Sequence, residues 1–94
     1  IVWRPKEMKY MTVWSIAPEH VKAASKRFFE AEPLEGIRRI GRWSEFGSFK
    51  GFDLLESDDP VAMTKLGMYW ADLVDMKVFP VVEDEVAGKA MGGG

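Results

Sequence analysis

Residues 49–60, Phe-Lys-Gly-Phe-Asp-Leu-Leu-Glu-Ser-Asp-Asp-Pro, predict a strand that runs directly into a helix. In extended backbone, successive side chains point to opposite faces of a sheet. One face of this strand therefore carries Phe52 and Leu54. The other face carries Asp53 and Leu55, so both faces contain apolar side chains. A strand of this kind is expected in the middle of a sheet.

The end of this segment carries the signals of a helix start. Asp59 can accept hydrogen bonds from the unpaired amides of a first helical turn. Pro60 suits the first helical position, where its missing N–H costs nothing. The sequence therefore predicts a β-to-α transition here, with a hairpin partner strand before it and a last strand after the helix.

Hydrophobic spacing predicts the remaining elements. Besides the strand within 49–60, strands are expected over 8–16, 37–46 and 73–82, and helices over 18–32 and 60–71. The arginines at 38, 39 and 42 fall on both faces of the second strand, which an edge strand tolerates. Pro80 places the last strand at an edge or near its end.

The predicted order is βαββαβ, which is the ferredoxin-like or split-βαβ arrangement. We therefore predict an α+β fold, a four-stranded antiparallel sheet with two helices on one face. A chain of 94 residues buries only about 60–65% of its unfolded surface, so one domain is expected, over 8–86. Residues 1–7 are interpreted as a leader or added extension. Residues 87–94 are interpreted as a flexible tail, and the whole segment from Glu83 is expected to be frayed.

Composition excludes several classes of protein. Hydrophobic residues make up 47% and charged residues 30%, as in soluble globular chains. No apolar run approaches the roughly 20 residues of a membrane span, and residues 1–7 contain no signal-peptide core. With no cysteine, disulfides and thiolate sites are excluded. These features predict a cytoplasmic protein without a membrane partner.

The charge is small but unevenly distributed. A net charge of −2 argues against a nucleic-acid partner, since such proteins are normally basic on one face. The first half contains the arginine group at 38, 39 and 42, whereas residues 51–94 are rich in acids. Internal or intersubunit ion pairs are the favoured interpretation. An anionic-ligand site at the arginines is the alternative.

Catalytic and metal motifs are not found. The single histidine, His20, is expected at the surface in the first turn of a helix, and its neighbours match no metal-ligand spacing. No serine is surrounded by a nucleophile elbow. Gly41, Gly47 and Gly51 lie in a predicted hairpin and are not followed by the residues of a phosphate loop. We predict no metal and no cofactor.

Aromatic side chains are more informative than ionisable ones. Large rings are numerous for so short a chain, and several are predicted on the sheet face opposite the helices. Their simplest role is core or subunit interface. The functional alternative is an apolar pocket containing a few polar groups. The predicted ligand-binding residues are Tyr10, Trp14, Arg39, Trp43, Asp53 and Trp70.

Two motifs resemble those of a known family. Gly-Arg-Trp at 41–43 and Trp-Ala-Asp-Leu-Val-Asp at 70–75 resemble a bacterial domain-of-unknown-function family of similar length, over roughly 8–86. The resemblance implies a domain of the dimeric α/β-barrel type, in which two ferredoxin-like sheets pack face to face. Many members place a histidine after Gly-Arg-Trp, where this chain has Ser44, so an imidazole cannot act there. Haem chemistry is not expected, because His20 is badly placed for an axial ligand.

Three hypotheses of function follow. The first is a small dimer that binds a small, partly apolar molecule in a sheet-face pocket. The second is a cofactor-independent oxygenase or isomerase with Asp53 or Glu56 as general base, its pKa raised by burial. The third is a structural or protein-interaction module. Dimerisation is expected through the open sheet face, because exposed apolar surface of that extent is unusual in a monomer. The residues assigned to that face are Tyr10, Thr12, Trp14, Trp43, Leu55, Phe79 and Val81.

Overall fold

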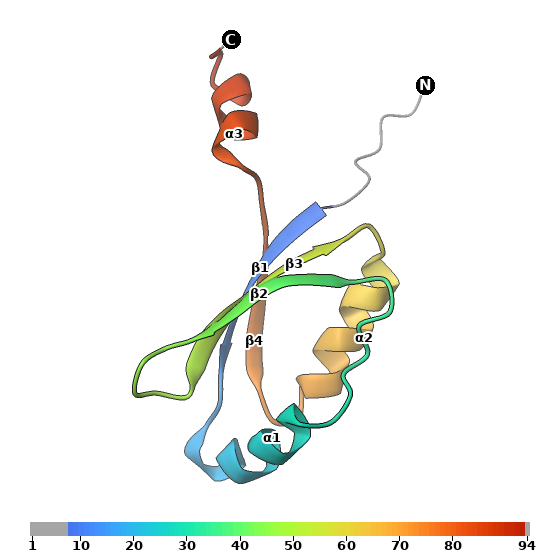
Figure 1. Cartoon of the computed structure of the whole chain (residues 1–94), viewed down its shortest axis with the longest axis vertical. Helices are drawn as coiled ribbons and strands as arrows, with labels where there is room; N and C mark the ends of the chain where they lie inside the picture. The colour runs from blue at the N-terminus through green and yellow to red at the C-terminus, as the bar shows by residue number, and fades with distance from the viewer. Residues whose placement is uncertain (1–7, 94) are drawn as a thin grey trace.

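Four antiparallel strands form one sheet in the computed structural model, which describes residues 8–93 (Figure 1). The strands are β1 (Met8–Ser15), β2 (Arg38–Ser44), β3 (Lys50–Ser57) and β4 (Asp75–Val81). The helices are α1 (Val21–Phe28), preceded by a 3-10 turn at Pro18–His20, α2 (Pro60–Trp70) and α3 (Asp84–Ala90). The strand order β2-β3-β1-β4 confirms the predicted ferredoxin-like α+β fold.

The strand that opens the sequence analysis is central, as predicted. β3 lies between β2 and β1, and β2 and β4 form the two edges. The edge positions agree with the irregular arginine pattern of β2 and with Pro80 in β4. Because β3 is paired on both sides, its side chains contribute to both faces of the sheet.

Both α1 and α2 cover the same face of the sheet (Figure 1). Leu55 of β3 is completely buried and packs with Ala24 of α1 and with Leu66 and Trp70 of α2. Val74, between α2 and β4, completes the buried cluster. The core therefore lies between one face of the sheet and the two helices, and the other face has no helical cover among the described elements.

The start of α2 confirms the predicted cap. The Asp59 carboxylate accepts hydrogen bonds from the backbone amides of Val61 at 2.9 Å and Ala62 at 3.2 Å. Pro60 occupies the first helical turn, where the absence of an N–H has no cost. These two adjacent residues thus set the position at which the chain turns from β3 into α2.

The predicted composition of the open face is partly wrong. Four residues assigned to it lie on the helix-covered face instead: Tyr10, Thr12, Trp14 and Leu55. Strand register explains the correction, since β1 and β3 pair Tyr10 with Leu55, and cross-strand partners share a face. α1 is short and contributes Ala24 as its only buried residue, so the large buried ring of this core, Trp70, comes from α2.

The face that α1 and α2 leave uncovered, hereafter the open sheet face, carries the opposite set of side chains. Its large apolar members, three of which the sequence analysis assigned correctly (Trp43, Phe79 and Val81), are Met11, Val13, Trp43, Phe52, Leu54, Phe79 and Val81. Trp43, Phe52 and Phe79 are 55%, 40% and 47% exposed. This face is therefore both apolar and accessible.

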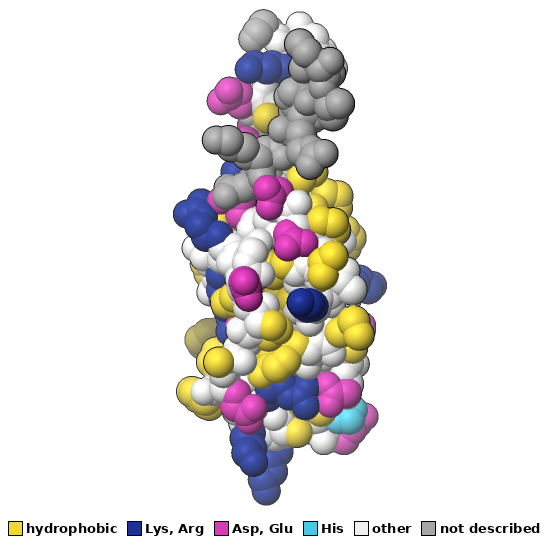
Figure 2. Space-filling model, turned by 90° about the vertical axis from the view of Figure 1, so that its right-hand side faces the viewer, with side chains coloured by type: hydrophobic (Ala, Val, Ile, Leu, Met, Phe, Trp, Pro, Cys, Tyr) yellow, Lys and Arg dark blue, Asp and Glu magenta, His cyan; other side chains and the backbone are white. Residues whose placement is uncertain are grey.

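Helix α3 follows β4 in a segment where the sequence predicted no regular element. It stands off the sheet at one end of the molecule (Figure 1). Residues 1–7, interpreted as a leader, lie outside the described residues. No helix within residues 8–93 has the length and apolar character needed to cross a membrane. Figure 2 views the molecule from the side of α2, where hydrophobic side chains gather between charged ones.

Candidate functional site

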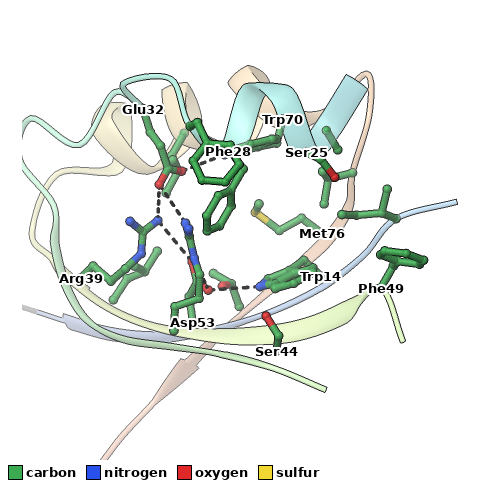
Figure 3. Close-up of a pocket in the computed structure, with 18 of the residues that line it drawn as sticks. Trp14, Ser25, Phe28, Glu32, Arg39, Ser44, Phe49, Asp53, Trp70 and Met76 are labelled. Carbon is green, nitrogen blue, oxygen red and sulfur yellow. Dashed lines mark hydrogen bonds and ion pairs between the residues drawn. The ribbon is translucent and has the colours of Figure 1, made fainter. Parts of the chain in front are cut away.

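A cavity of about 270 Å³ lies between the helix-covered face of the sheet and the helices (Figure 3). All four strands and both packed helices contribute to its wall. Its buried lining includes Thr12, Ala24, Asp53, Leu55, Leu66, Trp70 and Val74. Exposed lining residues, among them Ser25, Ser44 and Phe49, mark its opening to solvent. The cavity is thus on the opposite side of the sheet from the predicted pocket.

The cavity has a polar wall and an apolar end. Glu32, Arg39 and Asp53 lie together at one side in Figure 3. Trp14 and Met76, with aromatic rings from α1 and the β2–β3 turn, surround the other side. A molecule in the cavity would meet charged groups along one edge and rings or aliphatic side chains elsewhere.

Asp53 is the central acid of the polar wall. The residue is only 5% exposed. Its carboxylate accepts a hydrogen bond from Trp14 Nε1 at 3.1 Å and one from Arg42 Nε at 3.2 Å. Arg39 Nη2 lies 3.3 Å from the second carboxylate oxygen. A buried carboxylate is costly unless it is paired in this way, so these three donors hold the charge of Asp53 in place.

Glu32 is the second acid, and it comes from the loop between α1 and β2. Its side chain is 9% exposed and accepts a hydrogen bond from Trp70 Nε1 at 2.8 Å. Arg42 Nη2 and Arg39 Nη2 lie 2.8 Å and 2.7 Å from its other oxygen. Burial by itself raises the pKa of Glu32, but the hydrogen bonds from Trp70 and Arg42 and the charge of Arg39 outweigh it, so the pKa lies below its ordinary value. Glu32 is therefore ionised at neutral pH.

A β-bulge brings the arginines to the cavity. The pairing of β2 with β3 shifts register between Arg39 and Gly41. This shift places Arg39 and Arg42 on the same face although they are three residues apart, because a bulge inserts an extra residue into the alternation. Arg38 points to the other face and pairs with Glu56 at 2.8 Å. The mixed arginine pattern in the sequence is the result of this bulge.

Three buried polar atoms in this region have no hydrogen-bond partner within residues 8–93. They are the Thr12 hydroxyl oxygen, Arg39 Nε and Arg39 Nη2. Arg39 Nη2 is close to both acids, but those contacts are ion pairs without hydrogen-bond alignment. The carboxylate oxygens and both indole N–H groups, in contrast, are engaged. The unpaired atoms of the polar wall therefore belong to Thr12 and Arg39 and not to its carboxylates.

The structure brings together only part of the predicted site. Trp14, Arg39, Asp53 and Trp70 all line the cavity. Tyr10 is on the helix-covered face but outside the lining, and Trp43 lies on the open sheet face, where its ring covers Gly41. A shared pocket for all six predicted residues is therefore not retained. We keep it as a proposal for the four lining residues, with the pocket between the sheet and the helices.

The candidate bases of the enzymatic hypothesis are both paired with cations. Asp53 contacts Arg39 and Arg42, as described above. Glu56, buried on the other side of β3, contacts Lys9 at 3.3 Å and Arg38 at 2.8 Å. These cations occupy the carboxylate oxygens with which a general base would have to accept a proton from its substrate. The ion pairs therefore disfavour this hypothesis.

Sequence reasoning missed Glu32 and could not have found it from a local pattern, because the residue lies in a loop and its partners are distant in the chain. His20 is not among the lining residues. Ser44 does line the cavity, so the position at which the resembling family often has histidine faces this space. In this chain it supplies a hydroxyl near the opening.

Comparison with known proteins defines the family but no activity. No curated protein and no solved structure shows significant similarity to the chain. Residues 8–94 match the model of a family described as Domain of unknown function (DUF3303). This range includes every strand and helix described above, α3 among them. The chain therefore belongs to the DUF3303 family of domains of unknown function.

Proposed function

We propose that this protein binds a small, uncharged, partly apolar molecule in the cavity between the sheet and the helices. The observation that carries the proposal is the composition of the wall: aromatic rings at one end, and at the other a polar group whose charges cancel. Binding sites for small molecules typically combine an apolar lining with a few placed polar groups. The cavity fits that description.

The charge balance of the polar wall indicates an uncharged ligand. Glu32 and Asp53 neutralise Arg39 and Arg42, and every oxygen of the two carboxylates already accepts a hydrogen bond from Trp14, Trp70 or Arg42. A ligand carboxylate would bring a buried charge without a free cation, and a ligand amine would have to compete with the arginines for the two acids. Burying either charge without a partner is costly. An uncharged ligand avoids both costs.

The volume limits the ligand to about one or two rings. An engineered cavity of about 150 Å³ in another protein holds benzene, and this cavity is about 270 Å³. For a ligand such as 2-acetylnaphthalene, about 0.3 kcal/mol per non-hydrogen atom gives roughly 4 kcal/mol of binding free energy. The dissociation constant is then expected near or below about 1 mM.

Indole N–H signals in a ¹H–¹⁵N NMR titration with 2-acetylnaphthalene provide the test. We expect the signals of Trp14 and Trp70 to shift, because both indoles line the cavity and donate to its acids. Trp43 is the internal control, since it lies on the open sheet face. The matched anion 2-naphthoate should shift these signals at least tenfold less at equal concentration.

Ser25→Phe offers a variant that blocks the cavity. Ser25 is exposed at the opening on α1, and a ring there should abolish the shifts. Ala23→Phe adds the same ring to an exposed position of α1 outside the lining and should leave them unchanged. Absence of any shift with either ligand would contradict the binding proposal and favour the structural-module hypothesis. Stronger binding of the naphthoate would contradict the uncharged ligand alone.

We also propose that the open sheet face pairs with a second copy of the chain. Trp43, Phe52 and Phe79 on this face are 40–55% exposed, and rings bury large areas on association. Burying about 500 Å² of apolar surface is worth about 12 kcal/mol before the costs of association. A face-to-face pair of sheets would remove these rings from water.

Light scattering on a sizing column tests this pairing. At micromolar protein we expect a mass of twice the 10.7 kDa of the chain. Phe52→Glu should give the single-chain mass, because it places a carboxylate in the centre of the interface. Phe46→Glu is the matched control, since Phe46 is fully exposed in the β2–β3 turn. A single-chain mass for the unaltered protein would contradict the proposal.

A further inference from the structure

We infer that α3 is an arm that docks on a second copy of the chain, at the margin of its open sheet face and beside the sheet-to-sheet contact. The inference rests on the proposed dimer and adds the element that completes it. Within residues 8–93, α3 packs against no other helix or strand, and none of its residues is buried. Figure 1 shows it at the end of the molecule, beyond β4.

The isolation of α3 is visible in the dimensions of the molecule. The radius of gyration is 15.5 Å and the longest extent is 49 Å. A compact domain of this length would have a radius of about 12 Å. The family match extends through residue 94, so the arm is part of the domain that the family model covers.

A helix of this length requires a packing partner. α3 has seven residues, whereas isolated helices shorter than about 12–15 residues are marginal in water. Its side chains are arranged for packing, because Val86, Ala87, Ala90 and Met91 recur at i, i+1, i+4 and i+5 and form one apolar side. Val86 and Met91 are 48% and 81% exposed. The apolar side is thus uncovered in the single chain.

Charge indicates which surface covers it. Asp84 and Glu85 lie in the first turn of α3. Lys50 and Lys77 lie on the open sheet face, and neither has an ion-pair partner within the described part of the chain. An acidic helix start and an apolar helix side therefore match a surface of exposed rings and unpaired lysines. That surface is present on every copy of the chain.

The base of the arm is tied to one end of the sheet of its own chain. Glu83, the residue before α3, forms an ion pair with Lys9 at the beginning of β1. Lys9 in turn contacts Glu56 of β3 at 3.3 Å. This link fixes the point at which the arm leaves the sheet, and α3 then projects outward. A second copy, facing the first, is the occupant that can meet it.

Val86→Asp tests the arm in the full chain. It places a carboxylate on the apolar side of α3 and should weaken the dimer at least tenfold in sedimentation equilibrium. Gly88→Asp adds the same carboxylate on the other side of α3, where a Cβ meets no atom within 4 Å, and should leave the dissociation constant within twofold. Equal dissociation constants for the two variants would contradict the docking of α3 but not the proposed dimer. If the unaltered protein were monomeric, both proposals would be contradicted.

Cysteine cross-linking gives a second readout that does not depend on affinity, because the chain has no cysteine of its own. Val86→Cys protein is mixed with each of three single-cysteine variants on the edge strands of the open sheet face: Trp43→Cys, Phe79→Cys and Val81→Cys. At least one mixture should give a disulfide-linked heterodimer on a non-reducing gel. A different outcome would overturn the inference. In it, no mixture gives a cross-link, whereas the corresponding double-cysteine variants form a disulfide and keep the single-chain mass. The arm would then fold on the sheet of its own chain.

Discussion

Replacing Asp53 by asparagine is expected to lower the free energy of unfolding by about 3–5 kcal/mol, because it breaks a buried ion pair from one side. Asp53 is 5% exposed and is shared by Arg39, Arg42 and the Trp14 indole. Without its charge, Glu32 alone faces two guanidinium groups. Chemical unfolding at fixed protein concentration measures the loss.

Asp72→Asn is the matched control for this substitution. Asp72 forms a bidentate pair with Arg27, at 2.6 Å and 3.0 Å, but its side chain is 61% exposed. Solvent screens such a pair, so the expected loss of stability is much smaller than that of Asp53→Asn. If Asp53→Asn and Asp72→Asn lowered the free energy of unfolding by similar amounts, burial of the polar wall would not strengthen its ion pairs.

A double variant separates lost charge from lost shape. Asp53→Asn combined with Arg42→Gln restores one positive and one negative group to the wall. If uncompensated charge dominates the loss, the double variant should be more stable than the sum of the two single losses predicts, by about 0.5–3 kcal/mol. Additive losses would show that the contacts matter and the charge balance does not, and would weaken the inference of an uncharged ligand.

The fold was predictable because its signals are local. Asp59 and Pro60 mark the start of α2, the helix that begins at this point of the chain. The alternation of apolar and polar side chains identifies each strand. Pro80 indicates that its strand lies at an edge of the sheet, whichever strand is its neighbour. Element order then leaves few ways to arrange four strands and two helices. These steps need no information about distant contacts.

The faces and the site were less predictable because they depend on register. A shift of one residue moves every side chain of a strand to the other face, and nothing in the sequence of β1 states which face receives the helices. The bulge between Arg39 and Gly41 is visible only once β2 is paired with β3. Glu32 joins the site from a loop whose path is set by packing. Trp14 and Asp53 were correctly grouped, but on the wrong side of the sheet.

β3 connects the two proposed surfaces through simple alternation. Asp53 and Leu55 face the cavity and the core, while Phe52 and Leu54 face outward on the open sheet face. Gly51 completes the inner row. A Cβ at this position would lie 2.2 Å from Cζ2 of Trp14, so the glycine leaves the space that the indole fills. The position of Trp14 in the cavity wall thus depends on the absence of a side chain at Gly51.

Gly51→Ala is therefore expected to destabilise the protein by about 1–3 kcal/mol, the usual range for overpacking a filled site. Its methyl would also lie 2.5 Å from the backbone oxygen of Trp43 on β2. A backbone atom in a paired strand cannot move aside as a flexible side chain can, so the Trp14 ring has to shift. The 3.1 Å hydrogen bond from Trp14 to Asp53 should lengthen, which a displaced indole N–H signal would report.

Gly67→Ala provides the opposite case in the same chain. Gly67 lies in α2, and a Cβ there meets no atom within 4 Å. Alanine restricts the unfolded chain and suits a helix interior, so this substitution should stabilise the protein by about 0.5–1 kcal/mol. The two variants add the same methyl group and are expected to change the free energy of unfolding with opposite signs. If Gly51→Ala were as stable as Gly67→Ala, then Trp14 would not be packed over β3, and the cavity would lack the indole wall on which the binding proposal depends.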